Sequence, residues 1–554
     1  MLKKTVFHGV LSISLFLFSG CEVGPDYEKP KLNLPIQTNA RADEEVAEFL
    51  VEGWWRIFKD TTLDDLEKQA LKNNADIKQA IANIAEAAAL ADVSLADYFP
   101  SIAATATGMQ AGLSKSAAAS QGGKIIRAFD YVGTIGASYE LDFFGKYRRA
   151  NEAARANLLA SHASKEVVLL TVTSEVAKTY FALRAYDAKL AIARRTLKTR
   201  QESYLVYKSR FENGYCTEFD YLRMKAEMDS VKTTVLDLEA AAAKIENALS
   251  VLIGASPKDM IIRKTSRAST LEMLKIPTVV PSGLPSNLLA RRPDVVAAEG
   301  QLIAANANIG QAIAANFPSF SLTAAFGFEG STLGHVFHPS NEMWSLGQSI
   351  SLPLFAGGRI EGMTKVAEAR YKKALAGYEK TVQMAFRETL DALISAKKSS
   401  EIVASRTRQV DSLKKSYHIA LTQKESGLIG LLDLLDVERG LLSTEMELTN
   451  ALQNQLNAIV DLCKALGGGW SIERSAHPTN QKKAEKTEKT AIAAATTTAT
   501  TVASTTVDTT TTSTTNTAKS MIAAEKATAE KTTTATATVG ITTKTTTTTA
   551  TTKK

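Results

Sequence analysis

Hydrophobic side chains recur at alternating intervals of three and four residues along a stretch that contains neither proline nor glycine. The stretch runs from Gly145 to Gly214, and its periodic positions are Leu169, Val172, Val176, Leu183, Tyr186, Leu190, Ala193 and Leu197, with Thr179 filling one gap. This spacing is typical of the seam of an α-helical coiled coil. The pattern predicts one long helix, which would extend ~100 Å at ~1.5 Å per residue.

An equivalent stretch lies between Gly358 and Gly427, and its bounding glycines are again 69 residues apart. Each stretch ends in turn chemistry, a glycine preceded by Asn or Ser. We therefore expect a further helix to fold back along each long one, over residues 219–253 and 432–466.

The chain is internally duplicated. The segment "RFENGYCTEFDYL" (210–222) aligns with "QKESGLIGLLDLL" (423–435) at an offset of 213 residues, and "YFPS" aligns with "NFPS" at an offset of 218. At the offset of 213, "SYELDFFGK" (138–146) also aligns with "SLPLFAGGR" (351–359) and "ALSVLIG" (248–254) with "DLCKALG" (461–467). These four motifs in the same order are not explained by chance identity. The predicted organisation is a first structural repeat at residues 55–255, a linker at 256–279 and a second repeat at 280–470.

Each repeat opens with one helical stretch that ends at a proline, Pro100 or Pro318. Two segments of a different amino-acid composition follow it. These segments are rich in Thr, Ser, Gly, Ala, Tyr and Phe, as in "PSIAATATGMQAG" and "YVGTIGASYELDFFG". Their weak alternation predicts strands of about ten residues joined by Gly- and Ser-rich loops, four strands per chain. A small soluble hairpin in each repeat is the alternative interpretation.

Lys3 and Lys4 are followed by an apolar run too short for a permanent membrane helix and then by Ser-Gly. This is the layout of a secretory signal peptide over residues 1–20. Cys21 follows directly, as in bacterial lipoproteins, and would become the acylated first residue of a lipid-anchored segment at 21–54. Phe18 stands where Leu is commoner, so an ordinary signal peptide with a chance cysteine is the alternative. Glu22, by similarity to bacterial lipoproteins, would permit transfer to the outer membrane.

The formal net charge of +7 is concentrated in a Thr- and Ala-rich tail. From Lys482 onward there are ten Lys against five acidic residues, so the tail carries +5 and the body is close to neutral. A nearly neutral body argues against a nucleic-acid surface, since phosphate binding needs a clustered basic patch. The tail has few large apolar residues to bury, so we expect residues 471–554 to be disordered.

Candidate catalytic or metal-binding chemistry is sparse. The six His are scattered, no Ser/His/Asp grouping or phosphate loop is evident, and Cys216 and Cys463 lie in no CxxC or Cys/His spacing. We expect no enzyme activity, no cofactor and no metal site. The two cysteines are expected to be unpaired, although an oxidising compartment would allow a disulfide.

Membrane crossing constrains the assembly. The chain is expected to be exported, yet after the signal it has no run of 18 apolar residues, so it could cross a membrane only as a closed β-barrel. The four strands of one chain are too few to close a barrel, since membrane barrels have at least about eight strands. Two chains would supply eight strands and three would supply twelve, and the larger barrel leaves room for a channel.

Several motifs resemble the TolC-like outer-membrane efflux factors, and the lipoprotein start points to the NodT branch of that family. They are "CEVGPDYEKP", "WWRIFKDTTLDDL", "SYELDFFGKYRRANEAARANLLAS", "GLPSNLLARRPDVVAAEGQLIAANANIG", "FPSFSLTAAFG", "LPLFAGGR" and "ALGGGW", and together they cover residues 21–470 nearly end to end. The resemblance implies an α+β membrane protein that forms a homotrimer. Its 12-stranded outer-membrane β-barrel, four strands per chain, would be continued by a long α-helical coiled-coil tunnel in the periplasm. It also implies two partners, a periplasmic adaptor protein and an inner-membrane proton-driven transporter.

The best candidate for a channel gate is "LLDLLDVER" (431–439), which begins just past the turn at Gly427. Asp433 and Asp436 are three residues apart and share one helix face, so a trimer would form two stacked carboxylate rings that favour cations at a constriction. The resemblance places a Leu-x-x-x-Asp-x-x-Arg pattern here, in which Leu432 would be an apolar plug and Arg439 a latch to a neighbouring carboxylate or carbonyl. The alternative is a solvated helix face.

The two hairpins are expected to differ in mobility. Asp220 is the first-repeat equivalent of Asp433, but Arg223 replaces Asp436, so only the second hairpin need move when adaptor contact opens the gate.

The tip loops, residues 212–218 and 425–430, are the expected adaptor-docking surface, and simple turn chemistry is the alternative. The tip residues singled out for docking are Gly214, Tyr215, Gly427 and Leu428.

The predicted function is passive conduction of small molecules, such as drugs and toxic compounds, through the outer-membrane component of a tripartite efflux pump. Type I protein secretion and heavy-metal export are alternatives, although the sequence has no Met- or His-rich ligand cluster. A structural coiled-coil lipoprotein without a pore is an alternative of another class. The inner-membrane pump would select the substrate, so this sequence does not define it.

Overall fold

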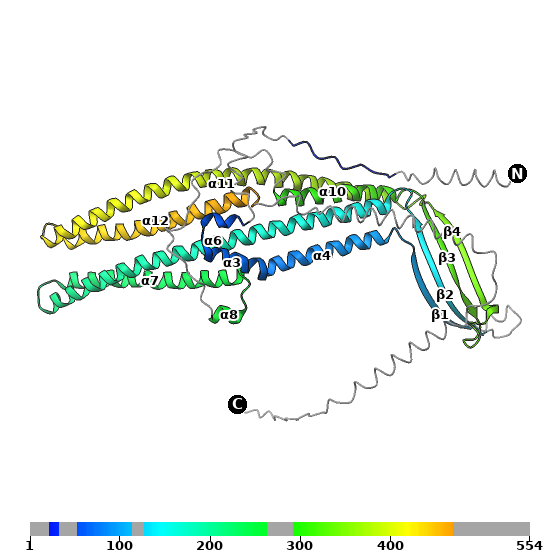
Figure 1. Ribbon diagram of the computed structural model, residues 1–554, viewed down its shortest axis with the longest axis horizontal. Helices are drawn as coiled ribbons and strands as arrows, with labels where there is room; N and C mark the ends of the chain where they lie inside the picture. The colour runs from blue at the N-terminus through cyan, green and yellow to red at the C-terminus, as the bar shows by residue number, and fades with distance from the viewer. Residues whose placement is uncertain (1–21, 33–52, 113–126, 263–291, 469–554) are drawn as a thin grey trace, which may run out of the picture. The chain divides into compact units, whose positions relative to one another are not determined.

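The computed structural model describes residues 22–32, 53–112, 127–262 and 292–468. The expected signal peptide, Cys21 and the Thr-rich tail lie outside the described residues, as do most of the expected linker and most of the lipid-anchored segment. The described part consists of long helices and one four-stranded sheet (Figure 1).

The helices fall into two sets that follow the same order. The first set is η2 (Trp54–Phe58), α3 (Thr61–Asn73), α4 (Ala75–Ala96), α6 (Lys146–Glu212), α7 (Glu218–Leu252) and α8 (Pro257–Ile262), and the second is α10 (Pro293–Ala314), α11 (Arg359–Glu425) and α12 (Leu431–Ala465). Equivalent helices have equal lengths: 22 residues for α4 and α10, 67 for α6 and α11, and 35 for α7 and α12. These equal lengths confirm the predicted duplication.

Each long helix is accompanied by two shorter ones. Helices α4 and α7 pack along α6, and α10 and α12 pack along α11, while α10 and α12 also contact α6 and so join the two repeats (Figure 1). We call α6 with α7 the first hairpin and α11 with α12 the second hairpin.

The predicted seam of α6 is confirmed by burial. Of its nine positions, Val172, Val176, Thr179, Leu183, Leu190 and Ala193 are buried, and the remaining three are half-buried. The three-and-four spacing therefore identified the face of α6 that packs against its neighbours.

One expected helix is divided. The sequence predicts a single helical stretch at the start of the first repeat, but the chain turns at Asn74 between α3 and α4. The Asn74 side chain accepts hydrogen bonds from the N–H groups of Asp76 (2.8 Å) and Ile77 (3.2 Å), and it donates one to the Leu252 carbonyl at 2.8 Å. Asn74 thus acts as the N-cap of α4 and ties it to the end of α7.

The sheet contains the four predicted strands. They are β1 (Ser101–Gly112), β2 (Arg127–Leu141), β3 (Ser319–Gly330) and β4 (Glu342–Ser351), all antiparallel in the order β1-β2-β3-β4, with the short helix η4 (Pro339–Asn341) before β4. Strands from the two repeats meet at the β2–β3 pair. β1 and β4 therefore form the two edges of the sheet within the described residues.

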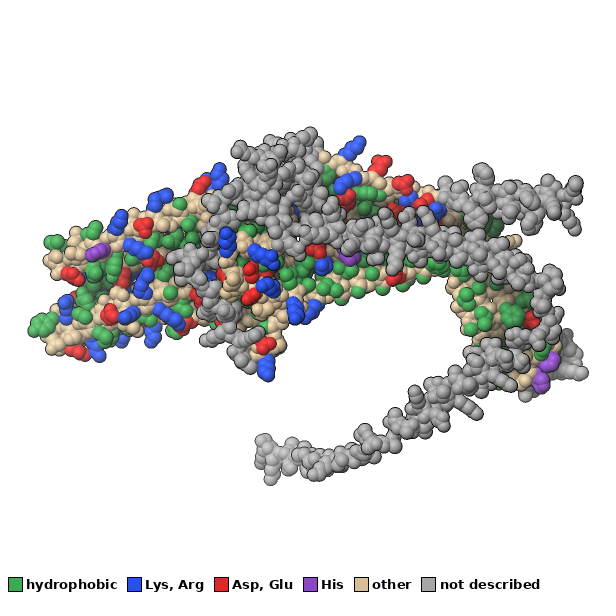
Figure 2. Space-filling model, viewed as in Figure 1, with side chains coloured by type: hydrophobic (Ala, Val, Ile, Leu, Met, Phe, Trp, Pro, Cys, Tyr) green, Lys and Arg blue, Asp and Glu red, His purple; other side chains and the backbone are tan. Residues whose placement is uncertain are grey.

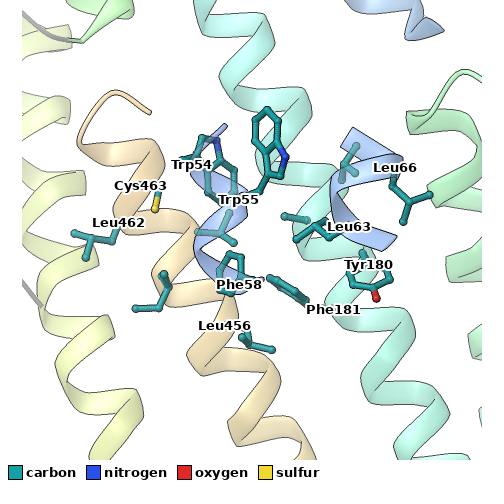
Figure 3. Packing of buried hydrophobic residues seen from close by; sticks show 14 of the residues in the cluster. Trp54, Trp55, Phe58, Leu63, Leu66, Tyr180, Phe181, Leu456, Leu462 and Cys463 are labelled. Carbon is teal, nitrogen blue, oxygen red and sulfur yellow. The ribbon is translucent and has the colours of Figure 1, made fainter. Parts of the chain in front are cut away.

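The main hydrophobic core lies where η2 packs between α6 and α12 and α3 packs against α6 (Figure 3). Trp54 and Phe58 are buried there, and the Phe58 ring meets Phe181 edge-on with centroids 4.9 Å apart. Asp60 begins α3 by accepting the Thr62 N–H at 2.8 Å, and its other oxygen accepts the Tyr180 hydroxyl at 2.7 Å. The cap of α3 is thereby bonded directly to α6.

A buried carboxyl group lies beside this core. Glu67 of α3 is fully buried, and neither of its side-chain oxygens has a hydrogen-bond partner among the described residues. Burial, together with the nearby charge of Asp64, raises the pKa of Glu67 well above its usual range. Burial therefore favours the neutral form of the Glu67 carboxyl, which costs less to bury than the charged form.

The segment of residues 22–32, here called the strap, docks against α6 and α10. The buried Arg149 of α6 forms ion pairs with Glu22 (3.2 Å) and Asp26 (2.7 Å) of the strap. Gly24 has a φ of +101°, and a Cβ there would lie 2.4 Å from the Cα of Gly310, so only glycine allows this approach. These contacts fix the strap where α6 begins.

Candidate channel gate and tip surfaces

Both hairpins end in a turn that requires glycine. Gly214 has a φ of +77° and Gly427 a φ of +73°, in the left-handed region that other residues rarely adopt. The next residue in each turn donates its N–H to a carbonyl five residues back, Tyr215 to Arg210 (2.7 Å) and Leu428 to Gln423 (2.9 Å). This is a helix-ending Schellman arrangement, and it leaves the Tyr215 and Leu428 side chains largely exposed at the tips.

Asp433 has a structural contact that the sequence did not predict. Its side chain accepts a hydrogen bond from the Gly430 N–H at 3.0 Å and so stabilises the first turn of α12. In the first hairpin the equivalent Asp220 carboxylate is bonded instead to the hydroxyl of Thr217, the N-cap of α7, at 2.8 Å. One of the two candidate gate carboxylates therefore also caps a helix.

The remaining predicted gate residues lie on the exposed side of α12. Leu432 and Asp436 are exposed and one helical turn apart, whereas Leu435 between them is buried. Arg439 donates from Nε to the Glu227 carboxylate of α7 at 3.1 Å. The structure thus pairs the predicted latch residue with a carboxylate of the first hairpin in the same chain.

A second ion pair next to this one was not anticipated. Glu438 of α12 lies 3.2 Å from Arg200 of α6; the Arg200 side chain is buried, with 2% exposed, and the Glu438 side chain is mostly covered, with 13% exposed. Burial lowers the pKa of Arg200 despite the Glu438 charge, and burial raises the pKa of Glu438 despite the Arg200 charge. Removal from water therefore outweighs the attraction between the two charges.

The sequence did contain a signal for this pair. Continuing the α6 seam three residues past Leu197 reaches Arg200, so a charge occupies a position that should be apolar. On α12 the buried Leu435 precedes Glu438 by three residues, and the buried Glu445 follows by seven. A charge at a seam position requires a partner, and Glu438 supplies it.

The sheet has two chemically different faces, which its register reveals. One row across the strands is Ala104, Ile135, Phe326 and Trp344, and the row beside it on the other face is Ala103, Gly136, Ala325 and Ser345. On the first face Trp344 is 74% exposed. One face therefore carries large apolar and aromatic side chains and the other carries small and hydroxyl-bearing ones, a separation that the weak alternation of the sequence only suggested.

The helical part has a different surface. Figure 2 shows Lys, Arg, Asp and Glu spread along the helices. Among the helices that the structure describes, none is long and apolar enough to cross a membrane.

Comparison with known proteins decides the family. Two segments, residues 66–255 and 284–468, match the outer membrane efflux protein family. They fall on the two sets of elements described above. The chain belongs to the outer membrane efflux protein family.

Relatives extend this match over most of the chain. The cation efflux system protein CusC of Escherichia coli O6:H1 is 32% identical over 456 residues, which cover 82% of this chain and 96% of CusC. The probable efflux pump outer membrane protein TtgC of Pseudomonas putida is 32% identical over 489 residues, covering 86% and 98%. The structure of the CmeC outer membrane channel of Campylobacter jejuni is similar with a TM-score of 0.76 and 26% identity, covering 81% of this chain and 96% of CmeC.

Family membership confirms the predicted TolC-like fold and the predicted class of function. As an outer membrane efflux protein, the chain is an outer-membrane channel component of efflux pump systems, with its helical region in the periplasm. It is a transport protein and not an enzyme. The roles of single residues at the tips are a separate question.

Proposed function

We propose that three copies of this chain close their sheets into a twelve-stranded barrel, continued by a helical tunnel, through which small molecules leave the cell. The observation that supports this best is an open four-stranded sheet with one apolar face and two edges. Edge strands readily pair with other strands. β1 of one copy pairing with β4 of the next is a head-to-tail contact, which forms a ring when it closes.

Exposed apolar side chains on the helices support the same assembly. Leu90 and Val93 of α4, and Ile394 and Ile402 of α11, are each more than half exposed in the single chain. Helices that line a shared tunnel would cover such residues with neighbouring copies, as in a coiled coil.

At the periplasmic end, Leu432, Asp433 and Asp436 from three copies form an apolar ring and two carboxylate rings. Because Asp433 also caps α12, Asp436 is the carboxylate free to act on passing ions. The pair of Arg439 with Glu227 holds α12 against the first hairpin in the closed state. Opening moves the second hairpin away from the first.

The partners are a periplasmic adaptor, docked on the tip loops at Tyr215 and Leu428, and an inner-membrane proton-driven transporter. Relatives named for toluene, solvent and antibiotic efflux support a small organic substrate. Equal identity to CusC makes cation export the second candidate. Cys21 carries the lipid anchor, and the docked strap that starts at Glu22 supports this position for it.

Single-channel conductance in planar bilayers tests the gate. We expect Asp436→Ala, alone or together with Asp433→Ala, to raise the closed-state conductance several-fold and to weaken cation preference, because the carboxylate rings are lost. Lys365→Ala, which removes an exposed ion pair on α11, serves as the control and should conduct like the unmodified protein. Unchanged conductance and selectivity in the Asp436→Ala protein would exclude a gate at this position.

A further inference from the structure

The two hairpins are joined near their tips by charges on adjacent residues of α12. Glu438 reaches Arg200 on α6, and Arg439 reaches Glu227 on α7. Because adjacent residues on a helix point about 100° apart, α12 is held to both helices of the first hairpin at one level. Arg439 is half-exposed, whereas Arg200 is buried and Glu438 is mostly covered.

The Arg200–Glu438 pair is poorly suited to adding stability. Arg200 is 2% exposed, and its Nε has no hydrogen-bond partner among the described residues. Elsewhere the α6 seam uses apolar residues such as Val176 and Leu183, which pack without any cost of removing charges from water. Charges buried at such positions have a better-attested use, which is to fix the position of one helix against another.

We propose that Arg200 and Glu438 form a clamp that positions α12 in the closed tip, and that opening separates them. This inference rests on the proposed gate at Leu432, Asp436 and Arg439. A buried guanidinium tolerates only the placement of α12 that presents Glu438 to it. Intermediate placements leave both charges buried and unpaired, so α12 occupies either the clamped position or one in which water reaches both groups.

The clamp has no counterpart in the duplicated unit. At the offset of 213 residues, Arg200 corresponds to Leu413 and Glu438 corresponds to Lys225. The pair therefore acts between the two hairpins of one chain and is not a remnant of the repeat. It identifies Arg200 and Glu438 as positioning residues that act through α12 on the gate.

The test compares conductance and thermal stability of four proteins. Glu438→Gln removes one charge with little change of shape, and Arg200→Met replaces the charged guanidinium with a shorter apolar side chain. Each should raise the closed-state conductance several-fold. The apolar pair Arg200→Met with Glu438→Leu should return conductance to the unmodified level, because packing replaces the clamp without leaving a charge unpaired. The control, Asp461→Asn, breaks the Lys178–Asp461 pair between the same two helices, ~35 Å nearer the sheet at ~1.5 Å per residue. It should leave conductance unchanged.

Different results separate the clamp from the gate. Unmodified conductance in Glu438→Gln, while Asp436→Ala still raises conductance, overturns the clamp and leaves the gate standing. Unmodified conductance in both proteins overturns the gate and the clamp with it. A rise in Asp461→Asn equal to that in Glu438→Gln shows general loosening of the α6–α12 contact and overturns the clamp. If Arg200→Met does not assemble, the nearly isosteric Glu438→Gln decides the question alone.

Discussion

Single buried arginines hold separate parts of this chain together. Arg149 binds the strap to α6 through Glu22 and Asp26. Arg292 lies before α10, pairs with Glu388 of α11 at 2.7 Å and donates to the carbonyl of Ala465 at the end of α12 at 3.2 Å. Because a guanidinium stays charged inside a protein, each buried arginine fixes its acidic partners in place.

The strap makes a prediction about Cys21. Glu22, the next residue along the chain, is held at the start of α6 by Arg149. We expect labelled palmitate to be incorporated into the protein in growing cells and to be lost in Cys21→Ser.

Cys216→Ser is the matched control, because Cys216 lies in the tip turn of the first hairpin, and this protein should keep the label. Label that persists in Cys21→Ser would contradict the lipid anchor.

For single residues, the sequence predicted which positions form the gate candidate better than it predicted the side chains that contact them. The Leu-Asp-Arg pattern at the start of α12 located the gate candidate, and the structure places Leu432 and Asp436 together on its exposed side. Glu227 was not predicted, because it lies 212 positions before Arg439 and nothing in one sequence relates them. Arg200 could have been found, since it interrupts an otherwise apolar seam.

The two hairpins differ as elements. In the first hairpin Tyr221 stacks with Phe211 and Tyr204, with ring centroids 5.1 and 5.8 Å away. The equivalents of Phe211 and Tyr221 in the second hairpin are Lys424 and Leu434, which cannot form this stack. The first hairpin is therefore stiffened near its tip and the second is not, which supports movement of the second hairpin alone.

For the two hairpins, the testable prediction concerns adaptor binding at their tips. We expect Tyr215→Ala combined with Leu428→Ala to weaken binding of the cognate adaptor about tenfold, or ~1.4 kcal/mol, because both exposed apolar side chains are removed from the docking surface. The measurement is adaptor affinity by surface plasmon resonance, with single-channel conductance expected to stay unchanged.

Leu333→Ala is the control for this experiment, because Leu333 is equally exposed but lies in the connection between β3 and β4. Unchanged affinity in the tip double variant, or an equal loss in Leu333→Ala, would contradict adaptor docking at the tips.

Most elements followed from periodicity and duplication. The long helices and the helices that fold back were predicted to within a residue or two, because proline and glycine are absent from the long stretch of the first repeat and glycine ends each one. The break at Asn74 was missed, since one Asn in a helical pattern does not distinguish a cap from an interior position. The two sheet faces needed the strand register, because Gly and Ala dilute the alternation in β1.

At the scale of the whole molecule, a single chain leaves strand edges unpaired and apolar side chains exposed. Its sheet has an edge at β1 and another at β4, and apolar side chains such as Trp344 and Leu346 face outward. A membrane would cover the apolar face, and neighbouring copies would cover the edges. The proposed ring of three copies satisfies both requirements with one repeated contact.

The most direct test is disulfide cross-linking between neighbouring sheets in membranes. Thr107→Cys on β1 is combined in turn with Met343→Cys, Ser345→Cys or Ser349→Cys on β4, in a protein that carries Cys216→Ser and Cys463→Ala. At least one combination should give a ladder of cross-linked chains on a denaturing gel that ends at three. A ladder that ends at two or continues past three, or monomers in every combination, would contradict closure of one conduit by three copies.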